Sequence, residues 1–252
     1  MKRIMLRVSY DGTDYCGWQK QSNGLAVEEA LNRAISELTG TDIFVAGASR
    51  TDAGVHALGN VAVFDTDSPI PADKFSFALN QRLPSDIAVQ ESCEVEPDFH
   101  PRYCECVKTY EYRIYNGIHR NPLYSRFTYH FHHPLDVRLM NEAARYLTGE
   151  HDFASFCSAG AQVKNTVRTI YDAAVESLSL AEISPDTQLI TIRLRGNGFL
   201  YNMVRIIAGT LIRAGQGEFA PEHMSRIIDA ADRSAAGPTA PPQGLTLMKI
   251  EY

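Results

Sequence analysis

The pattern of apolar and polar positions along this chain predicts a mixture of strands and helices. Apolar residues alternate with polar ones over residues 3–10, as in a half-buried strand. Between Val27 and Leu38 they recur at helical spacing, and Gly40 follows where a helix would end. Similar spacing predicts strands at 43–46, 61–64, 87–92, 106–115, 126–132, 166–178, 188–195 and 245–252, and helices at 71–83, 137–147, 199–215 and 222–232.

These elements predict an α+β fold, because strands and helices do not alternate in the regular order of a parallel βαβ sheet. We therefore expect two related halves with a mainly antiparallel sheet flanked by helices. Residues 97–102 would join them, so that residues 1–100 form an N-terminal half and residues 101–252 form a C-terminal half. No sequence repeat relates the halves, so their similarity would lie in architecture alone.

A polar loop at residues 47–57 lies between two apolar runs and holds the clearest candidate for chemistry. It carries Arg50, Asp52 and His56 between two strands, and its glycines allow tight turns and close approach of a ligand. Asp52 alone would be interpreted as a turn residue, but its neighbours favour a functional site. An aspartate with the ordinary pKa of ~3.9 is ionised at neutral pH, so it acts as nucleophile, base or electrostatic stabiliser. For His56 we expect a structural role.

Composition and charge limit the possible partners. The chain has 252 residues, 44% of them hydrophobic, and a formal net charge of -6, which argues mildly against a nucleic-acid partner. Six basic residues and only three acidic ones lie between His100 and Arg138, so a basic face is compatible with the acidic total. The odd number of cysteines, five, fits reduced thiols. No apolar run approaches the ~20 residues of a membrane-spanning helix, and the N-terminus is no signal peptide, so we expect a cytoplasmic protein.

The same residues allow two other kinds of chemistry. The spacing of Asp52 and His56, or of His130 and His132, is compatible with metal binding, but neither pair has a third ligand at a recognisable interval. No metal is therefore expected. A retaining glycosidase would use Asp52 as its nucleophile and would need a general acid about 5 Å away. No second carboxylate for that role is evident in the sequence.

Other candidate residues lie outside the polar loop. Tyr110 and Tyr112 share one face of a predicted strand, where aromatic residues usually pack against neighbours. Trp18 either stacks on a base or anchors its own loop on the core. Arg205 lies away from the buried stripe of its predicted helix, where it can reach a cleft.

Six segments, which occur in order along nearly the whole chain, resemble the tRNA pseudouridine synthase A family. The second of them is characteristic on its own. The six segments are Asp11-Gly12-Thr13 with Gly17-Trp18-Gln19, Arg50-Thr51-Asp52-Ala53-Gly54-Val55-His56-Ala57, Lys108-Thr109-Tyr110-Glu111-Tyr112, His151-Asp152-Phe153 with Ser155-Phe156, Gly198-Phe199-Leu200 with Met203-Val204-Arg205, and Gly244-Leu245.

The resemblance implies that the protein isomerises uridine to pseudouridine at positions 38–40 in the anticodon stem-loop of tRNA. It implies a fold of two related α+β halves that share an antiparallel sheet, with the active site in the cleft between them. It also implies a homodimer that straddles the tRNA, and it implies neither a metal nor an organic cofactor.

The resemblance also assigns roles to individual residues. Asp52 would be the catalytic aspartate, which either attacks C1′ of the ribose or takes the proton from C2′ to give a glycal. Arg50 would fill the gap left when the uracil leaves its stack. Tyr110 would be a second catalytic residue, which stacks on the flipped uracil and helps to remove its C5 proton. Arg205 would pair with Asp52 and orient it, and Leu245 would contact the substrate.

The chain departs from the family pattern at two places. Ser49 stands where glycine is more frequent, and residues 26–28 are Ala-Val-Glu in place of Thr-Val-Gln, so that Glu28 replaces a glutamine. These departures leave open a divergent paralogue with altered target uridines. A non-catalytic RNA-binding protein of the same fold is a further alternative, since an antiparallel sheet with aromatic and basic residues suits RNA.

Overall fold

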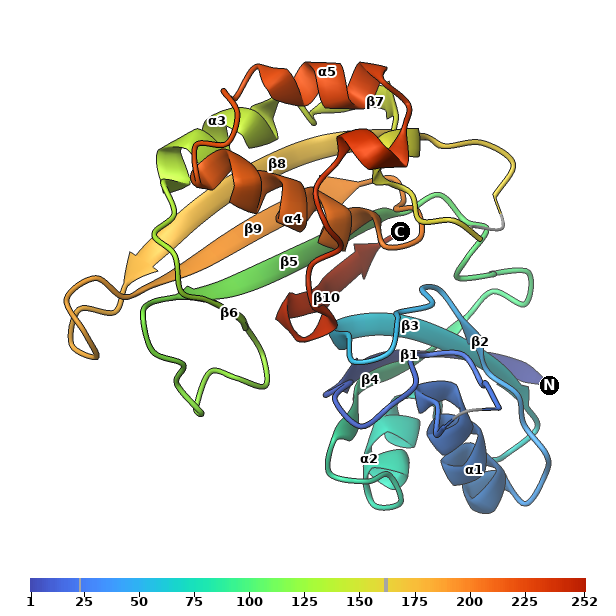
Figure 1. Ribbon diagram of the computed structural model, residues 1–252. Helices are drawn as coiled ribbons and strands as arrows, with labels where there is room; N and C mark the ends of the chain where they lie inside the picture. Colours follow the sequence, from blue (N-terminus) through green and yellow to red (C-terminus); the bar gives the residue numbers. More distant parts are fainter. Residues whose placement is uncertain (23, 161–162) are drawn as a thin grey trace. The chain divides into compact units, whose positions relative to one another are not determined.

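The chain forms two units that are each built around their own strands. The computed structural model describes residues 1–22, 24–160 and 163–252 (Figure 1). The first unit comprises Met1–Cys106 together with Leu247–Tyr252, and the second comprises Val107–Thr246. Compared with the expected halves, 1–100 and 101–252, the C-terminal segment is placed with the N-terminal unit.

The first unit is an antiparallel arrangement in the strand order β4-β1-β3-β10. β1 (Lys2–Tyr10) lies between β3 (His56–Thr66) and β4 (Ile87–Val95), and it pairs with both in antiparallel register. A short strand, β2 (Ala46–Gly47), also pairs with β3. The strand β10 (Leu245–Glu251) begins in the second unit and ends in the first.

Two helices pack against each other and supply the rest of this unit's core. α1 (Val27–Thr39) and α2 (Phe75–Asn80) lie on one side of the strands (Figure 1). The inward positions of α1 are buried, as the helical spacing predicts: Val27, Ala30, Leu31, Ala34 and Ile35. Gly40 ends the helix in the left-handed conformation, with φ 71°, and its N–H donates to the carbonyl of Ser36, which confirms the predicted helix end.

The second unit contains the strand order β5-β9-β8-β7. β5 (Val107–Asn116), β9 (Gln188–Gly196), β8 (Val167–Ser179) and β7 (Gly149–Asp152) pair in antiparallel fashion. β6 (Tyr129–Phe131) is the exception, because it runs parallel to β5. The predicted α+β fold with a mainly antiparallel sheet is confirmed.

Three helices cover this unit's strands. α3 (Val137–Arg145) packs on β8 and on α4 (Met203–Gly215), and α5 (His223–Asp229) follows α4 along the chain (Figure 1). α3 begins at Asp136, whose carboxylate accepts hydrogen bonds from the backbone N–H groups of Arg138 and Leu139.

The loop at residues 237–241 lies directly against α4. A Cβ atom on Gly209 would lie only 1.9 Å from the carbonyl oxygen of Pro238, so only glycine allows this approach. The N–H of Gly237 donates to Thr210 Oγ1 at 2.9 Å, and the N–H of Ala240 donates to the carbonyl of Arg205 at 3.1 Å. The loop is therefore held at three points along the helix.

The sequence prediction and the structure differ in three elements. The predicted strand at 43–46 is reduced to β2, because side chains of α1 bind its backbone: Asn32 Oδ1 accepts from Val45 N, and Ser36 Oγ accepts from Ile43 N. The predicted helix at 71–83 is α-helical only over α2. β7 was not predicted, since four residues are too few to show an alternating pattern.

An ion pair between β1 and β3 in the first unit can be used to test how these two strands are aligned. Arg3 on β1 lies opposite Asp65 on β3, and its guanidinium donates to both carboxylate oxygens, at 2.8 and 2.7 Å. Hydrogen bonding from Arg3 is the main cause that lowers the pKa of Asp65 below its usual value. A depressed carboxylate pKa stabilises the fold above the unfolded-state pKa, and this stabilisation is lost as pH falls through the folded-state pKa.

We therefore predict that Asp65→Asn lowers the free energy of unfolding at pH 7 by about 0.5–1 kcal/mol. The difference from wild type should shrink as pH falls through the lowered folded-state pKa of Asp65, and disappear once the wild-type carboxyl is also neutral. Urea titrations at a series of pH values measure this. Glu91→Gln is the matched control, because the pair of Arg7 and Glu91 also joins β1 to a neighbouring strand but is more exposed. A difference that persists unchanged at low pH would contradict the prediction.

Candidate active site

Asp52 lies in the loop that connects β2 to β3, in the first unit. The loop turns sharply after it: the N–H of Val55 donates to the carbonyl of Asp52 at 3.1 Å, and Gly54 has φ 75°. Asp52 is partly exposed, and Arg50 is exposed. The backbone around the carboxylate is therefore fixed by a closed turn while its side chain remains within reach of a ligand.

The segment at residues 11–22 braces this loop through its backbone. Trp18 N–H donates to the carbonyl of Thr51 at 3.0 Å, and Gly54 N–H donates to the carbonyl of Tyr15 at 3.3 Å. Gly17 has φ 108°, and a Cβ on it would lie 2.7 Å from the oxygen of Thr51. Glycine is required here both for its backbone conformation and for the close approach.

The same segment also holds the start of α1. The carbonyls of Gly17 and Trp18 accept hydrogen bonds from Val27 N and Glu28 N, at 3.1 and 3.0 Å. These bonds satisfy two N–H groups that a helix N-terminus otherwise leaves without a partner inside the helix. The carboxylate of Glu28, one of the departures from the family pattern, accepts a hydrogen bond from Lys20 N at 2.7 Å.

Trp18 anchors the loop on the core. Its side chain is 1% exposed, and a Cβ on Gly47 would lie 2.3 Å from its indole nitrogen. The indole ring therefore lies directly against the backbone where β2 ends and the Asp52 loop begins. Of the two roles considered for Trp18, its burial favours the anchor.

His56, at the other end of the loop, also contacts the segment at residues 11–22. It is buried, and the N–H of Gly12 donates to its Nδ1 at 3.0 Å. Its Nδ1 also lies 3.2 Å from Asp11 Oδ1. Asp11 Oδ1 accepts from the N–H and the hydroxyl of Thr13. These contacts support a structural role for His56.

A buried polar cluster lies beneath the loop, and sequence reasoning did not identify it. The hydroxyl of Tyr10 lies 2.7 Å from Thr51 Oγ1. Asn60 is fully buried, and its Nδ2 donates to the Tyr10 hydroxyl at 3.2 Å and to the carbonyl of Ser49 at 3.0 Å. The only sequence feature that points to this cluster is a polar residue, Asn60, within an apolar strand. Ser49 enters this cluster through its backbone carbonyl.

Tyr110 lies on β5 in the second unit and is buried, with 7% of its surface exposed. Its ring meets that of Phe199 edge to face, with the centroids 5.1 Å apart. Tyr112 is fully buried on the same strand, and its hydroxyl donates to the carbonyl of Pro241 at 2.8 Å. Burial raises the pKa of Tyr112, and the positive charge of Arg205 acts in the opposite direction. The packing role expected for Tyr112 agrees with these contacts.

Arg205 lies in the first turn of α4 and is partly exposed. Its Nε donates to the carbonyl of Ala240 at 2.8 Å, and its Nη1 donates to Asn202 Oδ1 at 2.7 Å. Leu245 begins β10 and is buried; a Cβ on the preceding Gly244 would lie 2.7 Å from the ring of Tyr112. Tyr110, Arg205 and Leu245 thus belong to the second unit, and Arg50 and Asp52 belong to the first.

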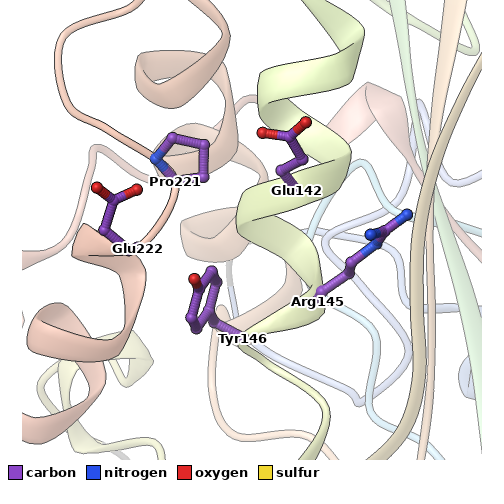
Figure 2. Close-up of a pocket in the computed structure, with 5 residues that line it drawn as sticks. All are labelled: Glu142, Arg145, Tyr146, Pro221 and Glu222. Carbon is purple, nitrogen blue, oxygen red and sulfur yellow. The ribbon is translucent and has the colours of Figure 1, made fainter.

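A hollow of about 370 Å³ lies elsewhere in the second unit, between α3 and the start of α5. Figure 2 shows the side chain of Tyr146 between these two elements. No residue that the sequence analysis selected lines it. Its lining residues are Glu142, Arg145, Tyr146, Pro221 and Glu222.

Within residues 1–22, 24–160 and 163–252, no three His, Cys, Asp or Glu side chains are grouped so that they could hold a metal ion. The pairs at Asp52 with His56 and at His130 with His132 therefore have no third ligand in this part of the chain. No helix in the described parts is long and apolar enough to cross a membrane.

Comparison with known proteins identifies the family of this chain. The family model described as tRNA pseudouridine synthase matches residues 7–104 and 143–252. The chain belongs to this family. It is 48% identical to a tRNA pseudouridine synthase A of Ruminiclostridium cellulolyticum and 46% identical to one of Acetivibrio thermocellus, and each alignment covers all of both chains. A tRNA pseudouridine synthase A of Geobacter sulfurreducens is 45% identical over the same full length.

The chain is therefore a tRNA pseudouridine synthase, an enzyme that isomerises uridine in tRNA. The match includes the Asp52 loop and the segment that braces it, and it confirms the resemblance found in the sequence. This assignment favours catalysis over the non-catalytic RNA-binding protein and the retaining glycosidase.

We predict that Gly12→Ala lowers kcat of the synthase on tRNA by about 10- to 100-fold, because it displaces the loop that carries Asp52, and small displacements of a group expected to act in catalysis have effects of this size. The new Cβ would lie 2.1 Å from the carbonyl oxygen of Val55, so the backbone after Asp52 must move. Gly24→Ala is the control, because its Cβ would contact only the side chain of Cys16, at 3.3 Å. Steady-state rates of both variants, with melting curves to confirm folding, provide the comparison. An unchanged kcat in Gly12→Ala would show that the segment at residues 11–22 does not position the Asp52 loop.

Proposed function

We propose that the synthase modifies uridines at positions 38–40 in the anticodon stem-loop of tRNA, with Asp52 as its catalytic carboxylate. The observation that carries this proposal is the braced loop: Asp52 follows a segment held by Trp18 and precedes a turn held by Tyr15, next to the exposed Arg50. The relatives named tRNA pseudouridine synthase A share the full length of the chain, which supports the choice of the anticodon stem-loop.

The reaction breaks the bond between N1 of uracil and C1′ of the ribose, rotates the base, and joins C5 to C1′. An ionised Asp52 serves either of two routes, attack on C1′ or removal of the C2′ proton to give a glycal. On the first route the bond between Asp52 and C1′ breaks as C5 bonds to C1′, and on the second the proton taken from C2′ returns to C2′ in the same step, so both routes regenerate the carboxylate. In the base, the proton lost from C5 balances the one gained at N1. The isomerisation is redox-neutral, and neither route consumes a co-reactant.

The partner residues act on the base and on the carboxylate. Arg50 is exposed beside Asp52 and fills the space that the flipped uridine leaves in the RNA stack. Tyr110, whose ring is backed by Phe199, stacks on the uracil. Arg205 pairs with Asp52 and keeps it oriented, and Leu245 contacts the substrate.

The enzyme works in the cytoplasm as a homodimer that straddles the tRNA. Binding of the RNA draws on selected basic residues, because the net charge of the chain is -6. Arg120 and Arg126 are exposed in the loop between β5 and β6, where they suit phosphate contacts.

The role of Asp52 is tested with an unmodified tRNA transcript. Wild-type enzyme should form pseudouridine, mapped by carbodiimide treatment and primer extension, and Asp52→Asn should lower kcat by a factor of 10³ or more, on the order of the loss seen when an activated nucleophile is removed. Asp14→Asn is the matched control, because Asp14 is an exposed carboxylate in the bracing segment. Equal rates for wild type and Asp52→Asn would remove Asp52 from the mechanism.

The target is tested by transcripts in which cytidine replaces the uridines at positions 38–40. We expect the modification signal to disappear at these positions and to appear at no other uridine. Since the remaining tRNA is unchanged, binding measured by filter retention should be kept. A signal at a uridine outside the anticodon stem-loop would instead assign the chain to a divergent paralogue.

A further inference from the structure

Asn202 has an unusual backbone conformation at the start of α4. Its φ is 60° and its ψ is 6°, and within the described chain it and Ala231 are the only residues other than glycine with positive φ. This left-handed region is sterically unfavourable for most residues, although asparagine tolerates it better than others. Such conformations persist where the surrounding structure requires them, frequently at functional sites.

The side chain of Asn202 does not serve the helix that it begins. An asparagine at this position usually accepts hydrogen bonds from the first N–H groups of the helix, as Asp136 does for α3, but Asn202 makes no such bond. Its Oδ1 instead accepts from Nη1 of Arg205 at 2.7 Å. Its Nδ2 donates to Ser158 Oγ at 3.0 Å. Because donor and acceptor are both engaged, the amide has only one orientation.

The guanidinium of Arg205 is thereby held from two directions. Asn202 Oδ1 binds Nη1, and the carbonyl of Ala240 binds Nε at 2.8 Å. A planar guanidinium that is fixed by two hydrogen bonds from separate segments cannot rotate about its last side-chain bonds. These two acceptors therefore contribute to the direction of its remaining N–H groups.

We propose that Asn202 is a positioning residue for Arg205. This inference rests on the proposed role of Arg205 beside the catalytic carboxylate. In the left-handed conformation its amide contacts Ser158 and Arg205 together, while it provides no side-chain cap to the helix. Its effect on the reaction passes through the orientation of the guanidinium, so the catalytic step depends on it and the binding of tRNA does not.

Asn202→Gly separates the side chain from the backbone, since glycine adopts positive φ without strain. We expect kcat to fall by about tenfold, the lower end of the effect of removing a residue that orients a functional group, with KM for tRNA unchanged. Ala231→Gly is the matched control, because it makes the same kind of change at the other positive-φ residue and should leave kcat unchanged. Melting curves of both variants show whether the fold is retained.

A double-mutant cycle with Arg205→Ala decides whether the effect passes through Arg205. We expect Asn202→Gly to have no further effect on kcat once Arg205 is removed. If Asn202→Gly lowers kcat by the same factor in both backgrounds, or has no effect on wild type, the positioning role is wrong. If Arg205→Ala itself retains wild-type kcat, the proposed role of Arg205 fails instead.

Discussion

The backbone of Trp18 is the point on which the first unit's site depends. Its N–H binds the carbonyl of Thr51, next to Asp52, and its carbonyl binds the first turn of α1. One residue thus connects a helix, a bracing segment and the proposed catalytic loop through main-chain hydrogen bonds, which side-chain substitutions do not directly remove. The indole of the same residue is buried against Gly47. A loop fixed in this way is preorganised before substrate arrives.

Much of the fold could be predicted because local patterns carry it. Alternation identified β1, and helical spacing with Gly40 identified α1 and its end. The strand predicted at 43–46 failed for a reason that is not local: Asn32 and Ser36 satisfy the backbone that a neighbouring strand would otherwise pair. A side chain from a preceding helix that replaces a strand partner leaves no trace in the hydrophobic pattern.

In the candidate site, too, residues in one contiguous segment could be predicted, and contacts between distant segments could not. Asp52 and Arg50 could be selected because the loop that carries them is contiguous and polar. The cluster of Tyr10, Thr51 and Asn60 could not, because its members meet only through antiparallel pairing of distant segments. The amide of Asn202 was missed for another reason: asparagine tolerates a left-handed backbone angle but only occasionally adopts it, so its presence in the sequence does not predict one.

The docking of loop 237–241 on α4 also determines how this part of the enzyme can fluctuate. Its amide protons at Gly237 and Ala240 are bound by Thr210 and Arg205 of the helix. They should exchange with solvent only when the helix opens, so loop and helix form one cooperative unit of local unfolding. Because Arg205 Nε also donates to the carbonyl of Ala240, motion of the guanidinium is coupled to this loop as well.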